Sequence, residues 1–342
     1  MRNNAIVITA PHEIEMQDIG LRELRAEDAR IAVKAIGICG SDINYFKGSA
    51  QTKIPYPLIM GHEVSGEIVE LGTAGGGFAV GDHVVLSPYS PCGRCYPCSI
   101  GRSNCCTDIK VYGTHINGCA MEWCDHPTRY LVKVPRNMSW TMAAMAEPFA
   151  IALHGVSRLR LAAGEHVVII GAGAIGSLSA MAALSLGAVP IMVDIADSKL
   201  RLAGGTYGAR FAVNAATEDA IGRVREITGG RMAEAVMEIS GANEAVASSF
   251  EYVANAGRII LTGWAKSPLS IDTRVITRKE IDLLGQRNTD LSEISKAVQM
   301  ISTGQVDVMA IVTKTVSFND MAQTVAHVAE QPGANLKVVA SL

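Results

Sequence analysis

The sequence contains no basic tract and no internal repeat. Its formal net charge of −3 gives no reason to expect nucleic acid or an anionic membrane surface as a partner. Apolar stretches such as residues 143–155 are broken, here by Glu147, Pro148 and His154, so we expect no membrane span. The first residues also lack the cleavage pattern of a secretory signal, which predicts a cytoplasmic protein.

The chain of 342 residues is longer than one hydrophobic core usually organises, which predicts two domains. Residues 1–146 read as short strands between glycine- and proline-marked turns, which predicts a β-rich domain. Residues 147–284 alternate apolar strand runs with helical runs, the pattern of a doubly wound parallel sheet with crossover helices. The tail, residues 285–342, combines helical stretches with a final apolar strand.

A dinucleotide-binding fingerprint stands in the second half of the chain. The strand run HVVII leads directly into GAGAIG at residues 171–176, and the next strand run ends at Asp194. The fingerprint requires this context: a strand before the glycines, a helix after them and an acidic residue about 20 positions on. Gly171 permits the tight turn, Gly173 lets the backbone approach a pyrophosphate, and Gly176 allows close helix packing.

The acidic residue favours NAD over NADP. Asp194 would accept hydrogen bonds from the ribose hydroxyls and would repel a 2′-phosphate. Lys199 could contact the ribose or help to accept a 2′-phosphate, although a solvated helix lysine explains it equally well. The predicted cofactor-binding residues are Gly171, Gly173, Ala174, Ile175, Gly176, Asp194 and Lys199.

Five of the eight cysteines lie in the segment PCGRCYPCSIGRSNCC. Cys92, Cys95 and Cys98 are spaced C-x2-C-x2-C, and Cys106 follows after seven residues. Four thiolates on a short loop match the tetrahedral preference of a structural zinc site. An iron–sulfur cluster needs the same thiolates, although its usual C-x2-C-x2-C-x3-C-P run is missing, and a redox dithiol would leave the other cysteines unexplained. We expect only one of Cys105 and Cys106 to be a ligand.

A second set of metal-ligand types is spread along the chain. Cys39 lies in GICGSD, His62 and Glu63 lie in GHE, and Glu147 lies in EPFAIALHG. One thiolate, one imidazole and carboxylates can hold a zinc and leave a position open, as catalytic sites do. Sequence spacing alone does not join these four residues.

Taken together, these segments resemble the zinc-dependent medium-chain dehydrogenases. GICGSD, G-H-E-x-x-G, the four-cysteine loop ending GRSNCC, EPFA and GAGAIG occur in the order and at the approximate intervals of that family. The resemblance covers essentially the whole chain. It implies a β-rich GroES-like catalytic domain, completed by the C-terminal tail, and an α/β Rossmann domain that binds NAD. It also implies two zinc ions per chain and a homo-oligomer, either a dimer or a tetramer.

The resemblance assigns roles to residues. By position, Cys39, His62, Glu63 and Glu147 match the sphere of the catalytic zinc, with a carboxylate at position 147 as in the sorbitol dehydrogenase branch. It also favours Cys106 as the fourth ligand of the structural zinc. A catalytic zinc makes a substrate hydroxyl more acidic, and the nicotinamide then accepts a hydride.

Proton release is the step at which the sequence departs from its relatives. Ser41 matches the hydroxyl that passes the proton onward, and the next relay position, commonly histidine, is Asn44 here. Asparagine cannot take a proton at neutral pH, so either bulk water or another group must complete the relay. Glu63 or Glu147 could exchange with water or substrate at the metal.

The substrate pocket is less defined. Tyr45 and Arg287 align with family positions that contact substrate hydroxyls, and Arg287 could bind a carboxylate or form a salt bridge. Cys119 replaces a glycine common in this branch, and Trp123 takes the usual aromatic place. Cys119 and Cys124 have no metal spacing, so we expect them to be small buried side chains.

The resemblance is strongest to bacterial enzymes that act at C5 of hexonates and hexitols. It predicts oxidation of a secondary alcohol of a linear polyol or sugar acid: L-galactonate or L-gulonate, or a hexitol such as D-altritol, galactitol or L-iditol. A threonine 3-dehydrogenase-like enzyme is the alternative, which Asn44 disfavours. A zinc-stabilised NAD-binding protein without catalysis is a further alternative, and it would hold about one zinc instead of two.

Overall fold

The computed structural model describes residues 2–50, 52–331, 333 and 335–342. The chain forms two compact units, each with its own hydrophobic core. Unit 1 comprises Met1–Ala150, Asn288–Gly304 and Val312–Leu342, and unit 2 comprises Ile151–Arg287 and Gln305–Ile311. Helix α4 (Ala146–Leu159) begins in unit 1 and continues in unit 2.

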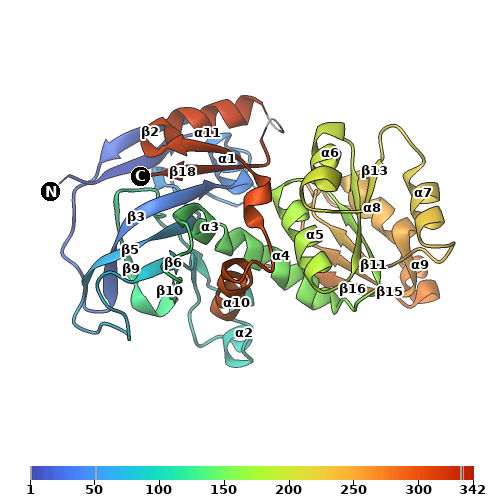
Figure 1. Ribbon diagram of the computed structural model, residues 1–342, viewed down its shortest axis with the longest axis horizontal. Coiled ribbons are helices and arrows are strands. Elements are labelled where there is room, and N and C mark those ends of the chain that lie inside the picture. The colour runs from blue at the N-terminus through green and yellow to red at the C-terminus, as the bar shows by residue number, and fades with distance from the viewer. Residues whose placement is uncertain (1, 51, 332, 334) are drawn as a thin grey trace. The chain divides into compact units, whose positions relative to one another are not determined.

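Unit 1 is built on a seven-stranded sheet. Its strands are β3 (Asp28–Ile38), β5 (Glu63–Leu71), β6 (His83–Leu86), β9 (Trp123–Pro127), β10 (Leu131–Lys133), β17 (Val312–Ser317) and β18 (Lys337–Ser341). They pair in the order β10-β6-β5-β3-β18-β17, with β9 also paired to β3 (Figure 1). β17 and β18 are parallel, whereas the other pairs are antiparallel. The last strand of the chain therefore lies beside β3, a strand from its beginning.

Strand β3 shows how the sequence fits this sheet. Its register with β5 shifts between Val33 and Ala35, so the strand carries a bulge there. A one-residue shift exchanges the two faces of a strand, and Val33 and Ile36 consequently point into the same core although their spacing is odd.

Smaller elements surround the sheet of unit 1. A second sheet contains β2 (Glu13–Asp18), β1 (Asn4–Ala10) and β4 (Leu58–Ile59) in that order, and a two-stranded sheet pairs β7 (Tyr89–Ser90) with β8 (Lys110–Val111). The helices are α1 (Gly40–Phe46), α2 (Tyr96–Ser99), α3 (Trp140–Ala144), α10 (Leu291–Ser302) and α11 (Met321–Glu330). Asp290 and Glu293 form a capping box that fixes the start of α10.

Unit 2 contains a six-stranded sheet whose strands all run parallel. The strands are β11 (His166–Ile170), β12 (Val189–Asp194), β13 (Phe211–Asn214), β14 (Ala233–Glu238), β15 (Val253–Leu261) and β16 (Asp282–Gly285). Their order, β13-β12-β11-β14-β15-β16, is that of a Rossmann sheet. This confirms the predicted fold class.

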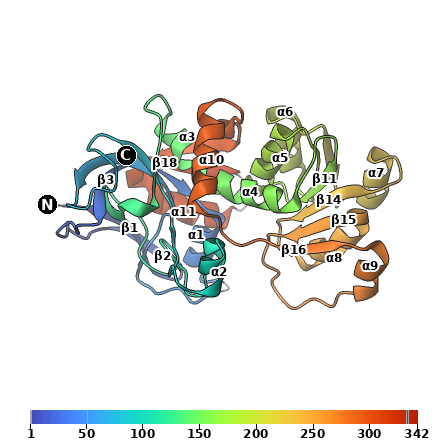
Figure 2. The same ribbon diagram turned by 90° about the horizontal axis from the view of Figure 1, so that it is seen from below.

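Helices cover both faces of the unit 2 sheet. They are α5 (Ala174–Ser185), α6 (Asp197–Thr206), α7 (Ala220–Ile227), α8 (Asn243–Tyr252) and α9 (Thr273–Lys279). Figure 2 shows α5 and α6 on one side of the sheet and α8 and α9 on the other. Helix α5 is composed mostly of small and apolar residues and is buried along most of its length, because it packs against β11, β12 and the segment Val308–Ile311.

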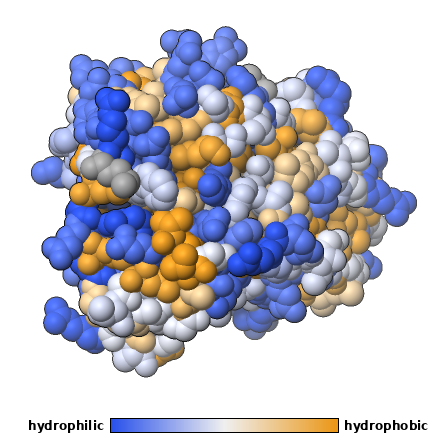
Figure 3. All heavy atoms as spheres, turned by 60° about the vertical axis from the view of Figure 1, so that its left-hand side comes forward, coloured by the Kyte–Doolittle hydropathy of each residue, from blue (hydrophilic) through white to orange (hydrophobic). Residues whose placement is uncertain are grey.

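The surface is mixed in polarity. The face drawn in Figure 3 combines polar side chains with small groups of apolar ones. Among the described residues, no helix has both the length and the apolarity that a membrane crossing requires.

Candidate catalytic and cofactor sites

The pairing of strands in unit 1 brings distant metal-ligand types together. β3 ends at Ile38, directly before Cys39, and β5 begins at Glu63, directly after His62. The two strands run antiparallel with Gly37 opposite Glu63, so these ends of the strands meet. The sheet thus joins residues whose sequence spacing gave no sign of contact.

Cys39, His62 and Glu63 form one donor group. Their ligand atoms lie within 4.8 Å of one another, and Glu63 is almost fully buried. A thiolate, an imidazole nitrogen and a carboxylate oxygen at this spacing suit a zinc ion with an open coordination position. The residues present therefore fit the metal that the sequence predicts.

Asp42 holds two members of this group in place. Its Oδ2 accepts a hydrogen bond of 2.9 Å from the backbone N–H of Cys39, and its Oδ1 lies 3.6 Å from Nδ1 of His62. Burial by itself would lower the pKa of His62, but the negative charges of Asp42 and Cys39 outweigh it and raise that pKa well above its usual value. A carboxylate behind a ligating imidazole orients the ring, so Asp42 is a positioning residue for His62.

Glu63 is paired with a buried lysine. The Lys337 ammonium forms an ion pair with the Glu63 carboxylate and donates a hydrogen bond of 3.2 Å to the Ile38 carbonyl. Lys337 is only 3% exposed and begins β18, which pairs with β3 at Ile38. Gly37 leaves room for the carboxylate, because a Cβ there would clash with it.

Glu147 lies near the donor group, but its carboxylate is not among the ligand atoms that lie within 4.8 Å of one another. Its Oε1 accepts a hydrogen bond of 2.5 Å from the Tyr89 hydroxyl. Burial raises the pKa of Glu147 to about 7, while the nearby His62 charge opposes that rise. Because a carboxylate has a second oxygen, Glu147 could bind a metal through Oε2 while Oε1 keeps its bond to Tyr89.

The predicted relay and pocket residues take different positions. Ser41 Oγ lies 3.4 Å from Nε2 of His62, at the donor group. Asn44 is exposed in α1. The Tyr45 hydroxyl is buried and hydrogen-bonds to Thr114 Oγ1 at 2.9 Å. Arg287 follows β16 in unit 2, so it belongs to a different unit from the donor group.

The four-cysteine loop closes into a second donor group. The Sγ atoms of Cys92, Cys95, Cys98 and Cys106 lie within 4.8 Å of one another, and the structure places Cys105 outside this set. Backbone N–H groups of Thr107 and Cys98 lower the pKa of Cys95 to about 6, which favours the thiolate. Four thiol groups at this distance suit a closed, tetrahedral structural zinc site.

The glycine turn of unit 2 has the geometry of a dinucleotide site. Gly171 has φ 110°, which favours glycine, and a Cβ at Gly176 would clash with the Gly171 carbonyl oxygen. A Cβ at Gly173 would meet nothing within 4 Å, so open space lies beside the turn. Helix α5 begins at Ala174 and continues through Ile175, so its N-terminal N–H groups can face a pyrophosphate.

A cavity of about 570 Å³ lies at the carboxyl ends of β11 and β12. Gly171, Asp194 and Ser240 are among the residues that line it. Asp194 Oδ2 accepts a hydrogen bond of 2.7 Å from Ala172, and Oδ1 accepts one of 2.9 Å from Ala196. These bonds fix a carboxylate at the cavity wall. Lys199 lies in the first turn of α6 and is half-buried.

Known proteins match both units. Residues 25–136 match the alcohol dehydrogenase GroES-like domain, and residues 174–303 match the zinc-binding dehydrogenase family. An uncharacterized zinc-type alcohol dehydrogenase-like protein of Haemophilus influenzae is 42% identical over 338 residues, which are 98% of this chain and 98% of that protein. The chain belongs to the zinc-dependent medium-chain dehydrogenases.

Further members of this dehydrogenase family agree. The 2-dehydro-3-deoxy-L-galactonate 5-dehydrogenase of Pseudoalteromonas atlantica is 31% identical, with 90% of each chain covered. A zinc-binding dehydrogenase of Sinorhizobium meliloti bound to NADP is 26% identical with a TM-score of 0.94, and 100% of both chains is covered. An alcohol dehydrogenase of Escherichia coli with NADH is also 26% identical, with a TM-score of 0.91 and 100% and 99% covered. The predicted enzyme class and cofactors, zinc and NAD(H), are confirmed.

Three buried residues of this dehydrogenase were missed by the sequence analysis: Asp42, Tyr89 and Lys337. Lys337 left the clearest signal, because a lysine inside the apolar run LKVVASL needs a buried partner. Asp42 stands three residues after Cys39, at the position where a carboxylate can cap the start of a short helix. Tyr89 has no comparable signal in the sequence.

Cys119 and Cys124 were expected to be small buried side chains. Their burial is confirmed, but the expectation did not include a bond between them. Their side chains are 3% and 2% exposed, but they form a disulfide. A spacing of five residues does not reveal this pairing, since it depends on how the loop after residue 113 meets β9.

Proposed function

We propose that this dehydrogenase oxidises a secondary alcohol of a linear polyol or sugar acid to the ketone with NAD as hydride acceptor. The favoured substrates are hexonates oxidised at C5, such as L-galactonate or L-gulonate, and hexitols such as D-altritol, galactitol or L-iditol. The observation that carries the proposal is the buried group of Cys39, His62 and Glu63 beside Ser41. It occurs in a chain that aligns over 90% of its length with a sugar-acid 5-dehydrogenase.

The residues of unit 1 suit the handling of a hydroxyl proton. A zinc held by Cys39, His62 and Glu63, with Glu147 able to join, would acidify the substrate hydroxyl and polarise the ketone in reverse. Ser41 lies close enough to the donor group to receive the proton through its hydroxyl. Because Asn44 is exposed and cannot take a proton, we propose that solvent completes the relay from Ser41.

The substrate preference rests on hydroxyl and carboxylate recognition. Tyr45 and Thr114 offer hydroxyls in unit 1, and their mutual bond of 2.9 Å orients both. We propose that Tyr45 contacts a substrate hydroxyl and that Arg287 binds the carboxylate when the substrate is an aldonate.

A substrate panel tests the proposed function. The zinc-loaded protein is mixed with NAD and hexitols, pentitols, hexonates or threonine, and NADH formation is followed by absorbance. Turnover confined to one stereochemical series of polyols or hexonates supports the proposal. Preference for threonine, or no turnover while two zinc ions per chain are bound, would refute it.

The preference for NAD is proposed from Asp194. Its fixed carboxylate would repel the 2′-phosphate of NADP and bind the ribose hydroxyls of NAD. In Asp194→Ser, kcat/KM for NAD should fall about 10-fold or more, the equivalent of roughly 1.4 kcal/mol, and the ratio of NADP to NAD use should rise. Adding Lys199→Ala to Asp194→Ser should reduce the NADP use that the single variant gains, if Lys199 helps to accept the 2′-phosphate. An unchanged cofactor ratio in Asp194→Ser would contradict this assignment.

A further inference from the structure

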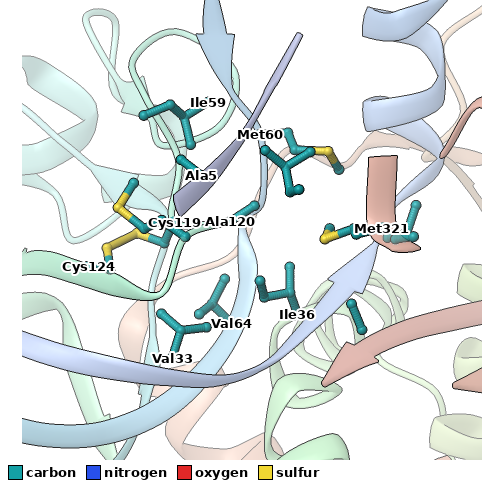
Figure 4. Close-up of a cluster of buried hydrophobic side chains, with 14 of the residues drawn as sticks. Ala5, Val33, Ile36, Ile59, Met60, Val64, Cys119, Ala120, Cys124 and Met321 are labelled. Carbon is teal, nitrogen blue, oxygen red and sulfur yellow. A yellow bond between two sulfur atoms is a disulfide. The ribbon is translucent and has the colours of Figure 1, made fainter. Parts of the chain in front are cut away.

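The disulfide between Cys119 and Cys124 joins a loop to strand β9 of unit 1. The two Cα atoms are 5.5 Å apart, a usual separation for this bond. Figure 4 shows both residues within the buried cluster that contains Ala5, Val33 and Ala120. None of the roles assigned above uses these sulfurs.

A buried histidine accompanies the pair. A ligand nitrogen of His126 and the two sulfurs lie within 4.8 Å of one another. His126 Nε2 is 3.0 Å from the Ser87 carbonyl and must donate to it, so the ring carries its proton there. Within the described residues, Nδ1 of this fully buried ring has no hydrogen-bond partner. Its lone pair is therefore not used by any other described group.

The pair lies at the wall of a cleft. A cavity of about 730 Å³ in unit 1 is lined by both Cys119 and Cys124. Polar groups line it as well, among them Arg22, Arg25 and Asn117. Its described lining residues do not include the donor group at Cys39. A small molecule in this cleft would therefore lie beside the pair and away from the donor group at Cys39.

We propose that Cys119 and Cys124 form a thiol–disulfide exchange site that reacts with a low-molecular-weight thiol bound in this cleft. The thiolate of the small molecule attacks one sulfur of the disulfide, a mixed disulfide forms, and the other cysteine leaves as a thiolate and takes up a proton. A second small thiol then attacks the mixed disulfide. In total, two small thiols are oxidised to one disulfide, and the protein pair is reduced to two thiols. The reverse reaction with a small disulfide restores the bridge.

His126 has a defined part in this exchange. Its Nδ1 accepts a hydrogen bond from a thiol of the reduced pair, which the disulfide cannot offer. Burial lowers the pKa of His126 to about 4, so the ring stays neutral and keeps this lone pair at physiological pH.

The state of the pair is transmitted towards His62 through the backbone. Cys119 N–H donates a hydrogen bond of 2.9 Å to the Gly61 carbonyl, and the neighbouring Ala120 N–H donates one of 2.9 Å to Met60. The loop thus forms a short ladder with the residues directly before His62. The disulfide links these hydrogen-bonded residues covalently to β9, and reduction breaks that link.

A metal ion is the competing occupant of this group of side chains. The disulfide sulfurs carry no thiolate charge, so the bridged pair offers a cation only one nitrogen ligand. The structure therefore favours exchange over metal binding, and a count of metal ions separates the two.

Peptide mapping tests the exchange directly on the whole, zinc-loaded protein. Trypsin cuts after Lys110 and Arg129, and the resulting peptide contains Cys119, Cys124 and no other cysteine. The folded protein is equilibrated in buffers of reduced and oxidised glutathione, alkylated, and then digested. We expect this peptide to change from no alkyl groups to two as reduced glutathione increases, and to change back with oxidised glutathione. Reduction only after denaturation, or two alkyl groups in every buffer, would overturn the proposal.

Variants give the test a second arm. Cys124→Ser should trap glutathione on Cys119 as a mixed disulfide, and Cys105→Ser, which alters a cysteine outside both the pair and the four-cysteine donor group, should exchange like the unaltered protein. His126→Gln keeps a donor for the Ser87 carbonyl and removes the Nδ1 acceptor, so exchange should slow several-fold while the thermal unfolding temperature changes little. An unchanged rate in His126→Gln would overturn the part assigned to His126. A third zinc per chain in the reduced protein, lost in Cys124→Ser, would replace the proposal with a metal site.

The link to His62 has its own readout, which does not depend on the substrate. Reduction should speed the loss of one zinc to a chelator several-fold, and the other zinc, in the four-cysteine loop, should be released at an unchanged rate. The double variant Cys119→Ser, Cys124→Ser should show the faster rate in every glutathione buffer. Equal rates in the bridged and reduced proteins would refute the coupling.

Discussion

At the scale of single residues, His62 and His126 show how surroundings set a side chain's role. The pKa of His62 is raised well above its usual value, while that of His126 is lowered to about 4. The difference follows from charge, because Asp42 faces His62 at 3.6 Å whereas a neutral carbonyl, that of Ser87, faces His126. A negative neighbour stabilises the protonated ring, and burial without one favours the neutral ring.

The lowered pKa of His126 predicts acid destabilisation. Between pH 6.5 and about 4 the unfolded chain holds a proton on this histidine and the folded chain does not, so stability falls as pH falls through that window. The contribution is full above pH 6.5, and its total loss is about 3 kcal/mol at most. Urea unfolding should show a shallower fall from pH 6.5 to 4 in His126→Gln than in the unaltered protein. Parallel curves for the two proteins would contradict the prediction.

The hydroxyl of Ser41 predicts a kinetic effect. If Ser41 receives the substrate proton, Ser41→Ala should lower kcat about 100-fold, the lower end of what general acid–base groups contribute. Zinc content should stay at the level of the unaltered protein, because Ser41 contributes no ligand. Ser49→Ala, an exposed hydroxyl in the following loop, is the matched control and should retain full activity. A small effect of Ser41→Ala on kcat would exclude it from the relay.

At the scale of elements, strand ends decide where the chemistry lies. The pairing of β3 with β5 joins Cys39 to His62 and Glu63, and the pairing of β18 with β3 adds Lys337. In unit 2, the turn from β11 into α5 places the glycines beside the end of β12, where Asp194 lies. In both units, functional residues lie at the first or last residue of a strand or directly beside it.

The glycine turn predicts a contrast between two alanine variants. Gly176→Ala should destabilise unit 2, because its Cβ would clash with the Gly171 carbonyl. Gly173→Ala should leave the thermal unfolding temperature nearly unchanged, since its Cβ meets nothing within 4 Å, but should weaken NAD binding at least 10-fold by occupying the space for the pyrophosphate. Calorimetry of unfolding and of NAD binding separates the two effects. Equal unfolding temperatures for both variants would be inconsistent with this geometry.

At the scale of the whole molecule, the two thiol-containing donor groups have different tasks: the group at Cys39 suits catalysis, and the four-cysteine group suits stabilisation of its loop. Cys39 directly follows strand β3 and lies beside Ser41, the proposed proton acceptor. Cys95 lies in a loop whose four sulfur atoms are within 4.8 Å of one another. A closed four-thiolate site leaves no position for substrate, and an open three-residue site leaves one.

This division predicts different losses in two serine variants. Cys39→Ser should remove one zinc per chain and abolish turnover while the unfolding temperature falls only slightly. Cys95→Ser should remove the other zinc and lower both the unfolding temperature and the solubility, because the loop loses its cross-link. Zinc content measured by emission spectroscopy, together with thermal unfolding, distinguishes them. The same loss of folding in both variants would disprove the separation.

The sequence by itself determined the features that are local in the chain. The Rossmann fingerprint could be found because a strand, a glycine turn, a helix and Asp194 follow one another within a single short segment, from residue 166 to residue 194. The four-cysteine loop could be found for the same reason, and the family resemblance joined Cys39, His62, Glu63 and Glu147 only because their motifs occur in a known order.

Only the tertiary structure decided the contacts between distant segments. The ion pair of Lys337 with Glu63 spans almost the whole chain and depends on β18 pairing with β3. The bond of Tyr89 to Glu147 and the approach of His126 to Cys119 and Cys124 likewise depend on how loops meet the sheet. Such contacts have no periodicity or fixed spacing, because the backbone pairing that creates them joins strands irrespective of their separation in sequence.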